Sequence, residues 1–201
     1  MQDERLKHFN LVGGTALALY MGHRKSIDLD FFSQEEFDTD DLESYLSEKY
    51  NFNMGDTEKK SRATLIGFID GIKVDCISYH YPFVEPVNVV DGVRMCSMVD
   101  IAAMKLTAIS QTGTRLKDFI DVAFLSTRMS FNDMLGAFEI KYPNTNKYTA
   151  IKGLTYFDDI DFSVKVEMIG GKYRWKEIEK RLLSMVDYPD KVFLSPPCLK
   201  T

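Results

Sequence analysis

The order of apolar and polar residues divides the chain into a first part built from short strands and a second part built from helices. Residues 26–32 alternate strictly, which predicts a strand with Asp28 and Asp30 on the face opposite its apolar side chains. Residues 61–69 and 72–79 alternate in the same way, and the Asp-Gly pair between them is typical of a tight hairpin. We therefore expect a sheet whose strands each have one apolar face.

Helix-forming segments surround these strands. A short apolar strand at 9–12 should lead through two glycines into a helix over 15–22, and Thr39 should cap a helix that continues to residue 50. Residues 88–95 are expected to form one further short strand. Beyond it, apolar residues recur with a helical period in four segments: 99–110, 115–128, 130–142 and 175–187.

The pattern predicts an α+β fold with a mixed β-sheet flanked by helices, followed by a C-terminal helical region. We assign residues 1–97 to the α/β core and residues 98–201 to the helical region. The helical region should pack onto the core, because no segment between the two has the composition of a flexible linker. With 45% apolar and 27% charged residues, the chain has the composition of an ordinary folded protein.

Charge and cysteine content limit the ligands and the cellular compartment that we expect for the protein. A net charge of −5 argues against a surface that binds any polyanion, so a nucleic acid should bind only locally. Cys76, Cys96 and Cys198 are odd in number and lack CxxC spacing, which is typical of a reducing compartment. There is no signal-peptide core and no apolar run near the roughly 20 residues that a membrane span needs. We expect a cytoplasmic protein with no membrane partner.

Acidic residues within apolar strands are the first sign of chemistry. Asp28 and Asp30 would repel each other on one strand face, and Asp75 lies inside another apolar strand, where an unpaired carboxylate is costly. Two Mg²⁺ ions, or Mn²⁺ in their place, would compensate these carboxylates and suit phosphoryl chemistry. The alternative is that Asp28 and Asp30 are solvated on an exposed edge strand.

Gly13, Gly14 and Thr15 stand where a strand passes into the N-terminus of a helix. Backbone N–H groups and the helix dipole can hold phosphate oxygens at such a point, and glycine permits their close approach. A plain tight turn is the alternative, because short glycine motifs are weak signals. A phosphate cradle, an acidic pair and a later acid nevertheless follow one another in order along the chain.

This ordered set resembles the nucleotidyltransferase superfamily with a polymerase-beta-like core. More narrowly, the chain is similar to the AbiEii/AbiGii toxin family of bacterial nucleotidyltransferases. The stretches that carry the resemblance are LVGGTALAL (11–19), GHRKSIDLDFF (22–32), IKVDCISY (72–79) and AAMKLTAISQTGTRLKDFIDVAFL (102–125).

The resemblance implies roles for single residues in the first part of the chain. Gly14 and Thr15 would hold the nucleoside triphosphate. Asp28 and Asp30 would be the metal-binding pair. Asp75 would be a third metal ligand or the base for the attacking hydroxyl.

Further residues are implied by the later motifs. Lys105 would contact the nucleotide phosphates from a helix, and its alternative is a lysine that snorkels from the edge of the core. Lys117, Asp118 and Asp121 match the last motif, and the two aspartates share a helix face at their spacing.

Residues just before the acidic strand add a smaller expectation. Arg24 and Ser26 are placed to contact phosphate, whereas a lone histidine such as His23 is usually a hydrogen-bonded filler.

Together these features predict a Mg²⁺-dependent nucleotidyltransferase that uses an NTP as co-substrate. It would transfer the NMP to a hydroxyl of an RNA, such as a tRNA, or of a protein, and release pyrophosphate. By resemblance, it would be a toxin or phage-defence component with a cognate antitoxin as partner. The main alternative is a catalytically silent nucleotidyltransferase-like domain that binds a partner protein. A metal-dependent phosphohydrolase is disfavoured because histidine ligands are missing.

Overall fold

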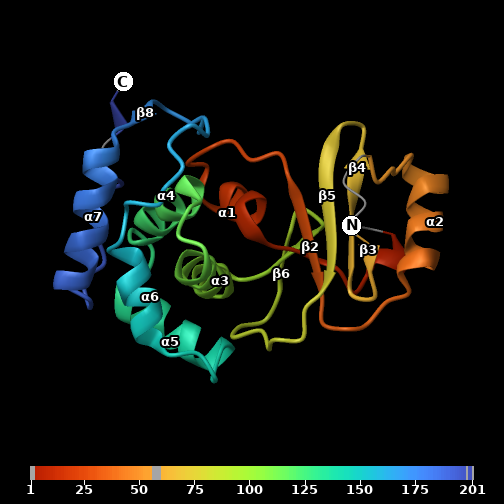
Figure 1. Cartoon of the computed structure of the whole chain (residues 1–201), viewed down its shortest axis with the longest axis horizontal. Coiled ribbons are helices and arrows are strands. Elements are labelled where there is room, and N and C mark those ends of the chain that lie inside the picture. The colour runs from red at the N-terminus through yellow and green to blue at the C-terminus, as the bar shows by residue number, and fades with distance from the viewer. Residues whose placement is uncertain (1–2, 56–59, 198, 201) are drawn as a thin grey trace. The chain divides into compact units, whose positions relative to one another are not determined.

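The computed structural model describes residues 3–55, 60–197 and 199–200, and it shows an α+β protein (Figure 1). No helix in these ranges is both long enough and apolar enough to cross a membrane. The chain divides into two compact units, the first of residues 1–16, 26–82 and 86–96, and the second of residues 17–25, 83–85 and 97–201.

Two short segments that the apolar pattern placed in the α/β core belong instead to the second unit. Residues 17–25 include Arg24, whose guanidinium is hydrogen bonded to Asp121 of the same unit. In residues 83–85, the backbone N–H groups of Val84 and Glu85 donate to the Asp100 carboxylate at 2.9 and 3.2 Å. Buried polar contacts of this kind have no signature in the spacing of apolar residues.

The first unit contains a mixed sheet in which β2 pairs with β5 in parallel and with β1 in antiparallel orientation. β1 also pairs with β7 in parallel. The mixed sheet that the pattern predicted is therefore confirmed. In the order β3-β4-β5-β2-β1-β7-β6, its strands are β3 (Lys60–Ser61), β4 (Thr64–Ile69), β5 (Ile72–Ser78), β2 (Leu29–Ser33), β1 (Asn10–Leu11), β7 (Val93–Met95) and β6 (Asn88–Val90).

Two of the hairpin turns of this sheet are formed by Asp-Gly pairs. Asp70 and Gly71 join β4 to β5 with φ values of 51° and 78°, as the sequence predicted. Asp91 and Gly92 have φ values of 51° and 76° and join β6 to β7. Positive φ at both central residues is the geometry whose twist matches antiparallel strands. The prediction of a single strand over 88–95 was therefore wrong, because this second Asp-Gly pair folds the segment into a hairpin.

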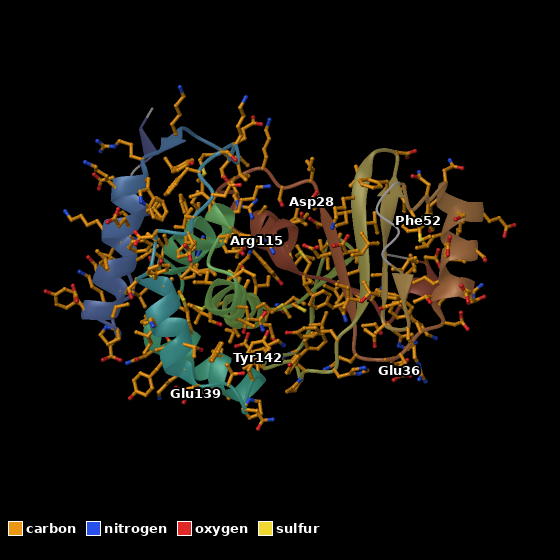
Figure 2. All side chains as sticks on the ribbon, in the orientation of Figure 1. Asp28, Glu36, Phe52, Arg115, Glu139 and Tyr142 are labelled. Carbon is orange, nitrogen blue, oxygen red and sulfur yellow. The ribbon has the colours of Figure 1, made fainter. Side chains whose placement is uncertain are left out.

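The acidic strand is shorter than its alternation suggests. β2 begins at Leu29, whereas the prediction began it at Ser26, and Ile27 is 72% exposed. The carbonyl oxygen of Asp28 accepts a hydrogen bond from the Thr15 hydroxyl instead of joining the sheet. Asp28 therefore lies just outside the strand, where Figure 2 labels it.

Helix α2 (Thr39–Tyr50) lies beside β4, as Figure 1 shows. Its N-cap is Asp38 and not the predicted Thr39, since the Asp38 carboxylate accepts hydrogen bonds from the backbone N–H groups of Asp40 and Asp41 at 2.9 and 3.0 Å. The helix buries Leu42 and Leu46 in an apolar cluster with side chains of the sheet.

The second unit is helical, and α3 contacts α4, α5 and α6 within it. Most of its helices agree with the predicted segments to within a few residues, but the short α6 was not predicted. Helix α1 (Gly13–Met21) begins in the first unit and continues into the second. The remaining α-helices of the second unit are α3 (Met98–Gln111), α4 (Leu116–Leu125), α5 (Phe131–Lys141), α6 (Lys147–Leu154) and α7 (Trp175–Asp187). Strands β8 (Lys172–Tyr173) and β9 (Leu199–Lys200) pair as a small second sheet.

One carboxylate ties the start of the first unit to α2. Asp3 caps the 3-10 helix η1 (Glu4–Leu6), and its Oδ2 accepts hydrogen bonds from the hydroxyls of Tyr45 and Tyr50 at 2.6 Å and from Lys49 Nζ at 2.9 Å. Burial alone would raise the pKa of Asp3, but these donors hold it well below its usual range. The fold is therefore stabilised by the ionised form of Asp3.

Asp3→Asn should lower the free energy of unfolding at neutral pH by about 1–2 kcal/mol, because charge-assisted hydrogen bonds become neutral ones. A lowered folded-state pKa makes this contribution complete above the unfolded-state pKa of about 4, and it is lost as the pH falls through the folded-state value. Melting curves recorded across pH should show a constant difference at neutral pH that narrows in acid. Glu4→Gln, at a neighbouring exposed carboxylate, is the control, and equal melting temperatures for Asp3→Asn and the unmodified protein would contradict the prediction.

Candidate functional site

The predicted site residues fall into two sets, one in each unit. The first unit holds the glycine turn, Ser26 and the three aspartates. The second holds Arg24, Lys105 and the last motif at 117–121. Each set is described within its own unit.

The glycine turn lies directly against the acidic strand. Helix α1 begins at Gly13, two residues before its predicted start, and Gly13 has a φ of 67°. A Cβ atom added to Gly13 would collide with the carboxylate of Asp30. Only glycine allows both this backbone conformation and this close approach. The carboxylate of Asp30 therefore lies directly against the N-terminus of α1 in the first unit.

Thr15 anchors the segment that leads into the acidic strand. Its hydroxyl donates to the carbonyl oxygen of Asp28, and its Oγ1 lies 3.0 Å from Ser26 Oγ. Thr15 and Ser26 were predicted to contact phosphate. In this structure their hydroxyls are within hydrogen-bond distance of each other and fix the backbone of Asp28.

Parallel pairing of β2 and β5 places two of the three aspartates side by side. Asp30 and Asp75 are register partners, so they stand on the same face of adjacent strands, about 4.8 Å apart along the hydrogen-bonding direction. Asp28 comes two residues before Asp30, just outside the strand. The sequence predicted that Asp28 and Asp30 share a face, but it could not predict that the strand of Asp75 is the neighbour.

A lysine that the prediction overlooked also belongs to this face. Lys73 Nζ donates to Asp75 Oδ1 at 2.6 Å and also to Oδ2. Lys73 precedes Asp75 by two residues on β5, so strand alternation already places both on one face. That spacing was the signal that could have identified it.

The donor chemistry of this face fits a divalent cation in part. Carboxylate oxygens are the ligands that Mg²⁺ prefers, and the Lys73 ammonium shows that a cation is already accommodated at Asp75. Within residues 3–55, 60–197 and 199–200, however, no group of three or more His, Cys, Asp or Glu side chains is gathered so that it could hold a metal ion. The carboxylate ligands and the negative charge therefore suit a divalent cation, but in the described residues the side chains are not gathered into a complete set of metal ligands.

The second set forms a buried ion cluster around Asp121. Lys105 Nζ lies 2.6 Å from Asp118 Oδ1 and 2.7 Å from Asp121 Oδ2. Arg24 donates to both oxygens of Asp121, through Nε at 2.7 Å and Nη2 at 2.8 Å. His23 Nε2 lies 2.8 Å from Asp121 Oδ1, which confirms the expectation that His23 is hydrogen bonded in the interior.

Charges within this cluster hold one another ionised. Burial would lower the pKa of Lys105, but Asp121 and Asp118 outweigh burial and keep the pKa above its ordinary value. Burial would likewise raise the pKa of Asp121, but Lys105, Arg24 and His23 hold it far below its usual range. Two carboxylates thus face two fixed cations, a balance that makes burial of all four tolerable.

Within this cluster, two residues that were predicted to contact phosphate are paired with buried carboxylates. Lys105 is neither a snorkelling lysine nor exposed to a ligand in this structure, because it is buried between two carboxylates. Arg24 is also buried, and its fork grips Asp121. Lys117 is partly exposed on α4. The last motif therefore has a clear structural part here, in which Asp118 and Asp121 hold α3, α4 and the Arg24 segment together.

Comparison with known proteins gives a consistent family. The model of the AbiEii nucleotidyl transferase toxin, of type IV toxin-antitoxin systems, matches residues 2–190. A relative from Aquifex aeolicus (strain VF5), the uncharacterized protein aq_aa25, is 33% identical over 178 residues, which are 86% of this chain and 83% of that protein.

Two solved structures share the fold. MenT4, a nucleotidyltransferase toxin from Mycobacterium tuberculosis H37Rv, has a TM-score of 0.58 and 14% identity, with 90% of this chain and 76% of that chain covered. JHP933 from Helicobacter pylori has a TM-score of 0.53 and 18% identity, with 91% and 84% covered. At such identities the likeness shows the fold alone. The family model, by contrast, spans almost the whole sequence, and the protein therefore belongs to the AbiEii family of nucleotidyl transferase toxins.

Proposed function

We propose that this protein transfers an NMP from an NTP to a hydroxyl of an RNA, such as a tRNA, or of a protein, in a reaction that requires Mg²⁺ or Mn²⁺. One observation carries the proposal. Asp30 lies against Gly13 at the start of α1 and is the register partner of Asp75, so two carboxylates stand near a helix N-terminus, a kind of place that suits a phosphate group. The family description names a toxin-antitoxin system, and we include a cognate antitoxin among the expected partners.

The proposed reaction is a displacement at the α-phosphorus. The acceptor oxygen forms a bond to that phosphorus, the bond to the bridging oxygen of pyrophosphate breaks, and the acceptor proton goes to a base, for which Asp75 is the buried carboxylate at hand. Backbone N–H groups at the start of α1 would hold phosphate oxygens. Metal ions held by Asp28, Asp30 and Asp75 would neutralise phosphate charge and orient the triphosphate.

The Lys73 ammonium has a place in this proposal because it neutralises Asp75 when no metal is bound. A lysine has a flexible stem and a compact charge, so it can leave the carboxylate and turn toward a phosphate when a divalent ion takes its position. The same pair also favours the alternative of a silent domain, since a permanent Lys73–Asp75 pair would keep metal away from Asp75.

Loss of either register aspartate should abolish transfer. The test incubates the unmodified protein and two variants, Asp30→Asn and Asp75→Asn, with labelled NTPs, Mg²⁺ and total RNA. The label transferred to RNA is then counted. Both variants should lose at least about a hundredfold in rate, because charge stabilisation at the reacting phosphate is lost. Asp91→Asn, in the exposed β6–β7 turn, should transfer at the unmodified rate. Transfer by either site variant near the unmodified rate would exclude this acidic face as the reaction site.

Lys73→Met separates the enzyme from the silent domain. If the ammonium and the metal compete for Asp75, removing the ammonium should raise the affinity for Mn²⁺ alone, measured by calorimetry. NTP affinity in the presence of Mn²⁺ should fall, because a phosphate partner is gone. A Mn²⁺ affinity that does not change in Lys73→Met would contradict the competition, and absence of metal-dependent NTP binding in the unmodified protein would favour the silent domain.

Lys105→Met tests whether the buried cluster is structural or binds nucleotide. Because the variant leaves Asp118 and Asp121 short of one cation, it should lower the free energy of unfolding by about 3–5 kcal/mol. Adding Asp118→Asn to Lys105→Met should restore part of that loss, and Lys152→Met, at an exposed lysine of α6, is the control. If Lys105→Met keeps its melting temperature but loses NTP affinity in calorimetry, the phosphate-binding role that the family resemblance implies would be favoured instead.

A further inference from the structure

The first unit contains a cavity on the side of its sheet opposite to the acidic face. It is partly enclosed, has a volume of about 210 Å³, and lies among side chains of α2, β2, β4, β5 and the N-terminal segment. Its wall consists of aliphatic, aromatic and thiol groups, chief among them Phe9, Leu29, Phe31, Leu46, Val74 and Cys76.

Strand alternation explains why the wall is apolar. Leu29 and Val74 are register partners, and Asp30 and Asp75 are the next pair along. Successive side chains of a strand point to opposite faces, so the strands that present the aspartates on one side present only apolar groups to the cavity. The cavity is the reverse side of the proposed reaction site and does not depend on that site's chemistry.

The few polar groups of the wall offer little hydrogen bonding to a ligand. The Tyr50 hydroxyl donates to Asp3 Oδ2 at 2.6 Å, which uses its only proton. Burial raises the pKa of the Cys76 thiol to about 12, so Cys76 is a neutral thiol and acts as a small apolar group. A polar molecule in this cavity would leave its own hydrogen bonds unmade.

We propose that this cavity binds one compact apolar molecule or group, of the size of an aromatic ring with a short alkyl substituent. An engineered cavity of about 150 Å³ lined by similar side chains stays dry and binds benzene or xenon. The cavity here is larger at about 210 Å³ and has a wall of the same chemistry. Shape and the apolar wall would select the ligand, and charged or hydroxylated molecules would bind more weakly.

The Asp3 contacts hold two elements of the cavity wall together. Leu6 and Phe9 belong to the wall, and both follow Asp3 in the N-terminal segment. Asp3 fixes that segment to Tyr45, Lys49 and Tyr50 of α2, and Tyr50 is itself part of the wall. Weakening these contacts should speed ligand entry and exit while the apolar wall stays in place.

Toluene and phenol are matched probes for the test, since they are similar in size and the methyl group of toluene is replaced by a hydroxyl in phenol. Titration of the full chain, followed by two-dimensional NMR, should show saturable one-to-one binding of toluene with the largest shifts at the amides of Leu29, Phe31 and Val74. Phenol should bind at least about tenfold more weakly, because its hydroxyl finds no partner. Asp3→Asn should exchange toluene faster than the unmodified protein.

A variant that fills the cavity completes the test. Leu46→Phe should weaken toluene binding at least about tenfold by occupying the space, whereas Leu19→Phe, at an exposed position of α1, should leave it intact. Circular dichroism and melting curves establish that each variant is folded, and the toluene and phenol titrations of the unmodified protein stand even if one is not. Absence of saturable toluene binding, equal affinity for phenol, or unchanged toluene affinity in folded Leu46→Phe would each overturn the proposal.

Discussion

The parallel pairing of β2 with β5 is the constraint on which the first unit depends. It joins Leu29 to Val74 and Asp30 to Asp75 in register, so one side of the two strands becomes acidic and the other apolar. A slip of one residue would exchange the faces and bury the carboxylates in the apolar cluster, at a cost far above that of an ordinary mispairing. The acidic face and the cavity behind it thus follow from a single register.

The glycine turn adds a second constraint at the same place. Gly13 approaches Asp30 so closely that any side chain would displace the carboxylate, and Thr15 holds the backbone of Asp28 just outside the strand. The position of the carboxylates and the electrostatic environment for a ligand therefore have different structural origins. Backbone contacts fix where the carboxylates stand, while the neighbouring helix terminus offers the positive end of its dipole to an anion.

Each unit handles its buried carboxylates differently. Asp121 is surrounded by Lys105, Arg24 and His23, and Arg24 grips it with both arms of a fork, so this charge is permanently compensated. Asp75 has Lys73 at one end of a flexible stem. The bidentate guanidinium of Arg24 is typical of a structural link between helices. The single ammonium of Lys73 can move aside, which is what a site for another cation requires. This difference in partners agrees with the roles we propose, in which Asp121 holds the fold and Asp75 takes part in the reaction.

Where the signal is local, neighbouring residues predicted the secondary-structure elements and the candidate chemistry. The Asp70-Gly71 turn, the apolar faces of the strands and the helix over 175–187 could be read from neighbouring residues, because periodicity and turn geometry act over a few positions. Asp91-Gly92 carried the same hairpin signal as Asp70-Gly71, so the second hairpin was within reach of the sequence. The pairing of Asp30 with Asp75 and the burial of Lys105 between two acids could not be predicted. Pairings between distant segments depend on the packing of the whole unit and leave no periodic trace in the chain.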